Sequence, residues 1–169
     1  PGRAFERSTY CFDILSDYGA FRDLQRHRIL SIDWQQLGPS NGYTAPAATE
    51  DVGALSDWRQ VMDRSAELHH RLETTVSPLV AQYAVSMAYR IRFYMHMNAR
   101  EAMHVIELRT APQAHPAYRR VCQTMHRLIR DQAGHHAIAD SLTFVDHSDV
   151  GLEGLEAERA TARRTQQPE

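Results

Sequence analysis

The sequence predicts an α+β domain, a small and mainly antiparallel sheet flanked by helices. Two observations carry this prediction. Apolar and polar residues alternate in the regions of Phe5, Ile29 and Val85, which is the two-residue period of a half-buried strand. Elsewhere apolar residues recur every three or four positions, the period of a helix with one buried face. We therefore expect the sheet to come from these three regions.

Length and composition narrow the class of protein. The 169 residues are enough for one core, and a formal net charge of −2 gives no general attraction for nucleic acid or an anionic membrane. Cys11 and Cys122 lie far apart, so neither a disulfide framework nor a thiolate metal site is indicated, and a cytoplasmic location is expected. No apolar run is long enough to span a membrane. Because the chain begins at Pro1 without Met, we expect a fragment of a longer protein.

The first half of the chain predicts two strands and two helices. Phe5–Ser16 is expected to be a strand, Ala20–Arg28 a short helix, and Ile29–Gln35 a second strand. The Gly- and Pro-rich stretch 38–46 is a loop, followed by a long helix over Asp51–Thr75. In the first strand one face holds Tyr10, Phe12 and Ile14, and the long helix has an apolar stripe of Leu55, Trp58, Met62, Leu68 and Leu72.

The second half begins with a helix start at Ser77-Pro78 and the clearest strand of the chain, over residues 85–96. Asn98 is expected to cap a helix over Ala99–Arg109, with Glu101 completing a capping box. A further helix over Ala117–Asp131 would turn its arginines to solvent, a partner chain or an anion: Arg119, Arg120, Arg127 and Arg130. We place the domain at residues 1–140, and a C-terminal tail, partly helical or disordered, at 141–169, including the charged segment Leu152–Arg164.

The segment Gln25–Gln35 contains three cationic or titratable side chains, Arg26, His27 and Arg28, next to a β-prone run. Arginine forks suit phosphates and carboxylates, and histidine can donate, accept or titrate near neutral pH. The alternative is a solvated helix end, where basic side chains meet the negative end of the helix dipole favourably.

With Ser31, the segment Phe93–Arg100 (ending Asn98-Ala99-Arg100) and Glu107-Leu108-Arg109, this Arg-His-Arg motif resembles the flavin-dependent thymidylate synthase family. That family has R-H-R-x-x-S-x-N-E-x-S-x-R, then an N-A-R segment that opens a helix and an L-R segment that closes it. Phe5-Glu6-Arg7 resembles the family's P-F-E-H segment. The resemblance covers about residues 5–130, and three motifs in register are far more specific than one.

The resemblance implies an enzyme that methylates deoxyuridylate (dUMP) to thymidylate (dTMP) with methylenetetrahydrofolate, reduced flavin and NADPH, in a homotetramer with sites shared between subunits. It implies FAD as cofactor and Arg109 as the catalytic residue, which favours the ionised uracil ring by opposite charge. No G-x-G-x-x-G follows a strand, so a Rossmann mode of cofactor binding is not supported. The implied cofactor-binding residues are Arg26, His27, Arg28, Asn98, Ala99, Arg100 and His104; the implied substrate-binding residues are Asp23, Gln25, Arg26, Gln36, Gln82 and Arg109.

The sequence departs from the family in the nucleotide-binding half. Where the family has Asn and Glu after the serine, this chain has Asp33 and Trp34, and the second Ser and last Arg fall on Gln36 and Gly38. A further family arginine falls on Gln82, and the family's usual Asn falls on His104. The chain alone is therefore expected to bind dUMP weakly, unless Arg90, Arg92 or Arg119 compensates.

Two alternatives remain. The ten histidines invite a metal site, but no H-E-x-x-H or Cys partner accompanies them. The stronger alternative is a non-catalytic, flavin-binding or oligomerisation half of a tandem protein, whose partner half supplies the missing nucleotide residues.

Overall fold

The computed structural model describes residues 2–148, which divide into two compact units. Unit 1 contains the chain up to Phe12, Asp23–Ser31 and the chain from Met95 onward, and unit 2 contains Asp13–Arg22 and Ile32–Tyr94. Each unit thus draws on stretches that lie far apart in the sequence. No helix in the described part of the chain has both the length and the apolar character that crossing a membrane requires.

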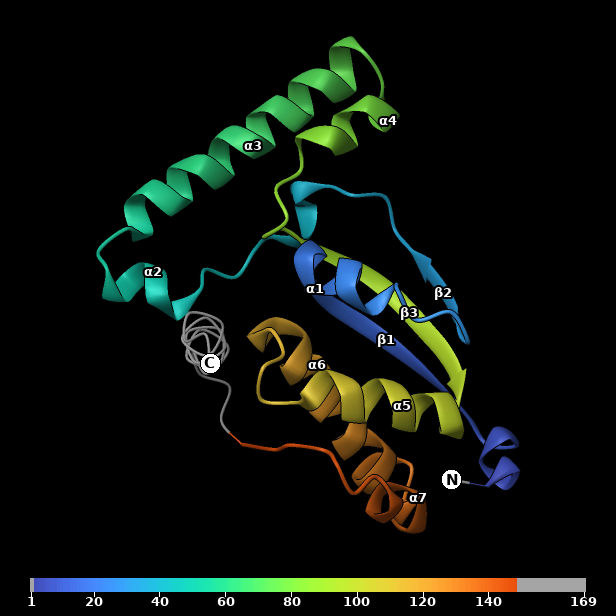
Figure 1. The fold of residues 1–169 in the computed structure, drawn as a ribbon. Helices are drawn as coiled ribbons and strands as arrows, with labels where there is room; N and C mark the ends of the chain where they lie inside the picture. The colour runs from blue at the N-terminus through green and yellow to red at the C-terminus, as the bar shows by residue number, and fades with distance from the viewer. Residues whose placement is uncertain (1, 149–169) are drawn as a thin grey trace, which may run out of the picture. The chain divides into compact units, whose positions relative to one another are not determined.

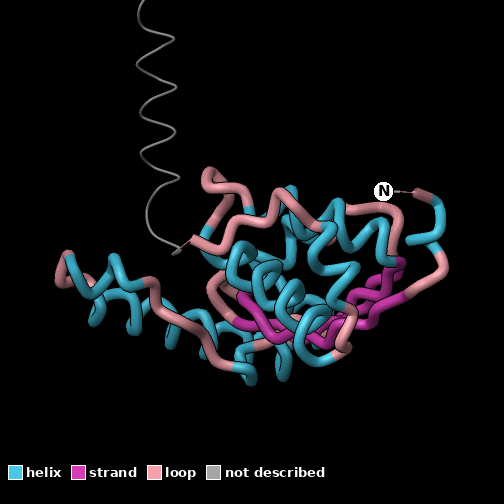
Figure 2. Tube along the Cα trace, turned by 90° about the horizontal axis from the view of Figure 1, so that it is seen from below, coloured by secondary structure: helices cyan, strands magenta, loops and turns pink. Residues whose placement is uncertain are grey.

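Three strands form one antiparallel sheet in the order β1-β3-β2 (Figure 1). Figure 2 shows the strands in magenta. They are β1 (Thr9–Asp17), β2 (Ser31–Trp34) and β3 (Arg90–Asn98). The backbone N–H of Tyr18 donates to the Tyr89 carbonyl at 2.9 Å, and that of Ala99 to the Ser8 carbonyl at 2.8 Å. Residue numbers therefore rise along β1 as they fall along β3, which is the antiparallel pairing that the sequence predicts.

The two long strands alternate buried and exposed residues, as their sequence pattern predicts. The predicted strand starts are wrong, however. Arg3–Glu6 form a 3-10 turn, η1, so β1 begins at Thr9 and not at Phe5. Residues 85–89 also precede β3 and are not part of it: the Ser86 N–H donates to the Ser65 hydroxyl, and the Tyr89 N–H donates to the Ser86 carbonyl. The buried positions are Tyr10, Phe12 and Ile14 in β1 and Ile91, Phe93, Met95 and Met97 in β3.

The helix after β1 is shorter and earlier than predicted. α1 (Tyr18–Leu24) begins directly at the strand end, because the Asp17 carboxylate accepts from the Ala20 N–H at 2.7 Å and so caps it. It ends at Leu24, which is fully buried. Arg26, His27 and Arg28 consequently lie in a loop, and the expectation that they form a helix end is wrong.

Unit 2 is mainly helical beyond its strand segments. It contains η2 (Pro39–Asn41), α2 (Ala47–Asp51), α3 (Leu55–Thr75), α4 (Pro78–Ala81) and η3 (Gln82–Ala84), and α3 packs beside α4 (Figure 1). The long helix predicted from Asp51 is interrupted at Gly53, whose φ of 70° ends α2. Of its predicted apolar stripe only Met62 is fully buried, together with His69.

Unit 1 packs α5 (Ala99–Thr110) against α6 (Pro116–Arg127), which continues through a π-turn, η4 (Leu128–Gln132), to α7 (His136–Ser141). Arg119 does not face solvent as predicted: only 1% of it is exposed, and its Nε donates to the Thr110 carbonyl at 3.1 Å. Its Nη2 reaches the Ser148 hydroxyl at 3.0 Å, so the segment after α7 accounts for this burial. Residues 149–169, including the expected segment Leu152–Arg164, lie outside the described residues, and the boundary at residue 140 stays a prediction.

Candidate functional site

Arg109 is placed by the helix that the sequence predicts best. The Asn98 side chain accepts from the Glu101 N–H at 2.9 Å, which caps α5 as expected. Ala102 and Ile106 are buried on one face of this helix, so its rotation is fixed by packing. Arg109 then lies in the last turn, partly buried.

The Arg109 guanidinium is held by three contacts within unit 1. Its Nη2 donates to the backbone carbonyl of Asp23, in the last turn of α1, at 2.8 Å. Its Nε donates to Nε2 of His27 at 3.0 Å, and its Cζ lies 5.3 Å from the centre of the Tyr118 ring. Because guanidinium has five N–H donors, these contacts fix its orientation and leave donors for a ligand.

His27 accepts the Arg109 hydrogen bond in its neutral form. Only 6% of its side chain is exposed, and burial, then the positive charge of Arg109, then His104, lower the His27 pKa from 6.5 to about 4. Its Nδ1 faces a Glu101 oxygen at 3.7 Å. Burial raises the pKa of Glu101, whose side chain is 8% exposed. Arg109 is therefore the permanently charged member of this cluster.

Three exposed arginines, Arg26, Arg28 and Arg100, belong to the same unit as this cluster. Arg26 and Arg28 flank His27 in the loop, and Arg26 lies 3.4 Å from the Asp23 carboxylate. Arg100 precedes His104 by one turn of α5, and the His104 ring meets the His27 ring edge-on at 5.6 Å between centroids. Arg100 also donates to Glu6 at 2.6 Å, so the Phe5-Glu6-Arg7 segment contributes a partner to the predicted cofactor residues.

The predicted residues Asn98 and Ala99 are engaged within the fold. The Asn98 oxygen caps α5, which leaves its amide N–H groups for a ligand. Ala99 is fully buried, and its backbone N–H donates to the Ser8 carbonyl. Ala99 thus supports the start of the helix. Gln25 is exposed beside Arg26 in the loop.

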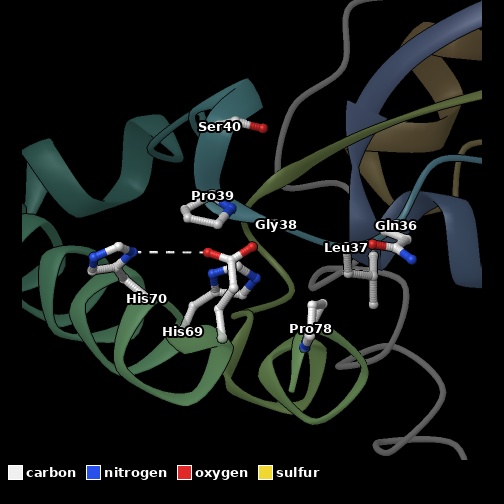
Figure 3. A pocket seen from close by; sticks show the side chains of 9 residues that line it. Gln36, Leu37, Gly38, Pro39, Ser40, His69, His70 and Pro78 are labelled. Atoms are coloured by element: carbon white, nitrogen blue, oxygen red, sulfur yellow. Dashed lines mark ion pairs between the residues drawn. The ribbon is translucent and has the colours of Figure 1, made fainter. Parts of the chain in front are cut away.

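Two predicted substrate residues lie in unit 2, where a cavity of about 420 Å³ is found. Gln36 lines this cavity with residues of the η2 turn and α3 (Figure 3). Gln82 accepts from the Leu37 N–H at 3.0 Å through its amide oxygen, so it holds the chain on which Gln36 lies. His70 and Glu73 form an ion-pair contact of 3.8 Å at the cavity, drawn as the dashed line in Figure 3.

The three arginines considered as replacements for the missing nucleotide contacts differ in their surroundings. Arg92 pairs with Asp13, with Nε 3.0 Å from the carboxylate, and Arg119 is buried in unit 1. Arg90 packs against Gly42, and its buried Nε has no hydrogen-bond partner among the described residues. Arg90 is therefore the one of the three whose Nε has no hydrogen-bond partner within the described part of the chain.

Cys122 is not prepared for nucleophilic chemistry. Burial raises the pKa of Cys122 to about 12, so it is a thiol at neutral pH. Cys11 is exposed on β1. Within residues 2–148 no three metal-ligating side chains are arranged to hold an ion.

Sequence reasoning missed two partners of the Arg109 cluster. Tyr118 was expected only as part of a helix, and Glu101 only as a cap residue, yet its carboxyl turns to His27. The one available signal for Glu101 was a charged residue among the apolar residues of the buried helix face.

Comparison with known proteins places these features in context. A family model described as thymidylate synthase complementing protein matches residues 1–133. UPF0159 proteins of Chlamydia muridarum and Chlamydia pneumoniae are each 38% identical to the chain over 92% of its length, and one of Thermoplasma acidophilum is 37% identical over 93%. The chain spans only 29%, 29% and 31% of these relatives, respectively.

A solved structure has a similar fold. The crystal structure of a UMP/dUMP methylase, PolB, from Streptomyces cacaoi, bound with 5-Br UMP, aligns with a TM-score of 0.68. The alignment covers 85% of this chain and 78% of that one at 17% identity, so this likeness concerns the fold alone.

Proposed function

Because the chain belongs to the thymidylate synthase complementing protein family, which comprises flavin-dependent thymidylate synthases, we propose that it is a flavin-binding domain of a longer synthase-like protein. The observation that carries this proposal is the arrangement of unit 1. A fixed Arg109 lies beside the neutral His27, and exposed arginines flank that histidine in the loop. In this proposal Arg109 faces the uracil ring of dUMP and favours its ionised form.

The residues present fit a flavin pyrophosphate in part. Arg26, Arg28 and Arg100 have exposed guanidinium groups that suit two phosphates, because anions leave water only where charge-assisted hydrogen bonds replace it. In this proposal His104 adds a ring edge and Asn98, at the start of α5, an amide. The buried Ala99 contributes shape and no polar contact. When bound, FAD in its reduced form supplies the hydride that completes the methyl group, whose carbon comes from methylenetetrahydrofolate.

The nucleotide half of the site is weaker in this chain. Gln36, Gly38 and Gln82 provide no permanent charge, and the Gln82 amide oxygen already accepts from Leu37. Each charge-assisted hydrogen bond lost from a desolvated site costs about 1.5–3 kcal/mol, so the combined loss is about 4 kcal/mol, or roughly a thousandfold in affinity. We therefore propose that this chain alone binds dUMP weakly and makes little thymidylate.

One observation favours the alternative of a non-catalytic half. The chain spans only 29–31% of the UPF0159 relatives, which leaves room for further domains in proteins of that length. In this proposal a partner domain, or further copies in a tetramer-like assembly, supplies the missing nucleotide contacts, while this chain supplies flavin contacts and an interface. NADPH as the source of reducing power belongs to the same proposal.

The test is a titration of the purified chain with FAD, followed by flavin absorbance and fluorescence. We expect saturable binding that weakens at least tenfold in the Arg28→Ala and Arg100→Ala variants, since each removes a phosphate contact. Arg120→Ala, which removes an exposed arginine of α6, is the matched control and should leave the affinity unchanged. A chain that shows no flavin spectral change at any concentration would contradict the proposal.

A further inference from the structure

Glu101 is a buried carboxyl for which the family resemblance gives no chemical role. It lies in the first turn of α5, its side chain is 8% exposed, and one of its oxygens lies 3.7 Å from His27 Nδ1. Burying a carboxyl without a strong partner is costly, and here burial raises its pKa. A helix of this kind would be more stable with an apolar residue at that place, so the carboxyl points to a function.

The contacts of His27 determine which of its nitrogens carries the proton. Arg109 Nε always bears hydrogen, so His27 Nε2 must be the acceptor of the 3.0 Å hydrogen bond. A neutral imidazole then carries its proton on Nδ1, and this N–H faces the Glu101 oxygen. The opposite tautomer would set two N–H groups against each other at Arg109 and leave the Nδ1 lone pair facing an oxygen.

We propose that Glu101 is a positioning residue that holds His27 in the Nδ1–H tautomer and thereby orients the Arg109 guanidinium; its effect on nucleotide chemistry rests on the function proposed above. The 3.7 Å separation is longer than a hydrogen bond, so Glu101 acts through the attraction between its carboxyl oxygen and the Nδ1–H. The groups that face His27 from the packed elements are Arg109, His104 and Glu101 of α5, and Tyr118 of α6 stacks on Arg109. Of these groups, Glu101 is the carboxyl that faces Nδ1.

The arrangement explains why three ionisable groups share one buried place. In the tautomer with the proton on Nε2, His27 would offer the Arg109 Nε–H no acceptor. Its remaining contacts, the Asp23 carbonyl and the Tyr118 ring, would leave the guanidinium free to rotate about one hydrogen bond. Catalytic donors act best when their orientation is fixed before the ligand arrives.

The direct test is nitrogen-15 NMR of the full chain, in which long-range proton–nitrogen correlations report the tautomer of each histidine at pH 7. We expect His27 in the Nδ1–H form and the Arg109 Nε–H protected from exchange with water. A wild-type chain with His27 protonated at Nε2 would overturn the proposal before any variant is made.

Variants then test the part played by Glu101. Glu101→Leu keeps the volume and removes the acceptor, so we expect a mixture of His27 tautomers and faster exchange of the Arg109 Nε–H. Glu101→Gln keeps an acceptor oxygen and should restore both signals, which a merely structural role would not predict. Glu67→Leu, the same change at an exposed position of α3, is the control. Unchanged His27 and Arg109 signals in folded Glu101→Leu would overturn the proposal, and Glu101→Ala gives the same readout if the leucine variant does not fold.

Nucleotide binding separates this inference from the proposed function. In flavin-loaded chains we expect Glu101→Leu to lower dUMP affinity by about tenfold and Glu101→Gln to retain it. Tautomer changes as expected, with no dUMP binding in any variant, would support the positioning role and contradict the proposed function. Measurable dUMP binding that is equal in all variants, with unchanged tautomers, would support the proposed function and contradict the positioning role.

Discussion

The Arg109 cluster of unit 1 and the cavity of unit 2 differ in whether a permanently charged side chain is held in a fixed position. In unit 1, Arg109 and Arg119 are tied to backbone carbonyls, so permanent cations have fixed places. In unit 2, the cavity is lined by neutral Gln36, and His70 and Glu73 pair with each other. The chain therefore retains a prepared cation in one region and lacks one in the other.

The largest effect on the free energy of unfolding is expected from replacing Arg119. This change tests whether the stability of unit 1 depends on a buried arginine. Arg119→Met would leave the Thr110 carbonyl and the Ser148 hydroxyl without this donor, and should lower the free energy of unfolding by about 3 kcal/mol. Urea denaturation measures this, with the exposed Arg120→Met as control. A loss equal to that of the control would mean that the buried guanidinium is not structural.

A comparable effect, of up to about 3 kcal/mol, is expected from the pH dependence of His27, because each unit of pKa shift corresponds to about 1.4 kcal/mol. Its pKa in the fold is about 4, below the ordinary 6.5, so the unfolded chain takes up a proton first as the pH falls. The stability that neutral His27 contributes is complete above pH 6.5 and is lost between 6.5 and about 4. The lowered pKa of His147 acts in the same direction and the raised pKa of Glu101 in the opposite one.

Comparison with variants isolates the His27 contribution. The free energy of unfolding of His27→Asn should fall less steeply from pH 6.5 to 4 than that of the wild type, while His147→Asn should follow the wild type more closely. Parallel curves for the wild type and His27→Asn would show that His27 is not held neutral by its surroundings.

In the cavity of unit 2 we expect that an arginine can be introduced at position 38, where the family has one. Position 38 has extended backbone geometry, and a Cβ there would meet the His69 ring only at 3.8 Å, so Gly38→Arg is sterically permitted. If the cavity is the weak half of a nucleotide site, this change should raise dUMP affinity by about tenfold. Gly38→Gln controls for side-chain size, and an equal gain in both variants would show that charge is not what the cavity lacks.

The smallest effect concerns Gln82. Gln82→Leu removes the acceptor for the Leu37 N–H and should lower the free energy of unfolding by about 1 kcal/mol. Gln60→Leu, an exposed position of α3, is the control. If Gln82→Leu loses no more stability than this control, the hydrogen bond to Leu37 is not structural, and ligand binding is the role left for Gln82.

Much of the fold follows from short-range pattern. The alternation of β3 and the Asn98 cap of α5 depend on residues within a few positions of each other, and both predictions are confirmed. Arg119 shows the limit of such reasoning. Its buried guanidinium contacts Ser148, 29 residues further along the chain, and nothing in the helix itself distinguishes it from the exposed Arg120.

The candidate site could be foreseen only through motifs. His27 and Arg109 are 82 residues apart, and no periodicity brings them together; the resemblance placed both at one site, where the structure has them in contact. The role of Glu101 could not be foreseen, because a glutamate three residues after an N-cap already has a local explanation. The side chain instead turns to His27.

The central claim, a prepared flavin and ring site without a complete nucleotide site, is tested most directly by isothermal titration of dUMP into the flavin-loaded chain. Tritium release from labelled dUMP in the presence of methylenetetrahydrofolate then measures turnover. We predict flavin binding, dUMP binding about a thousandfold weaker than a complete phosphate site would give, and little tritium release. Micromolar dUMP binding with clear turnover by this chain alone would contradict the account.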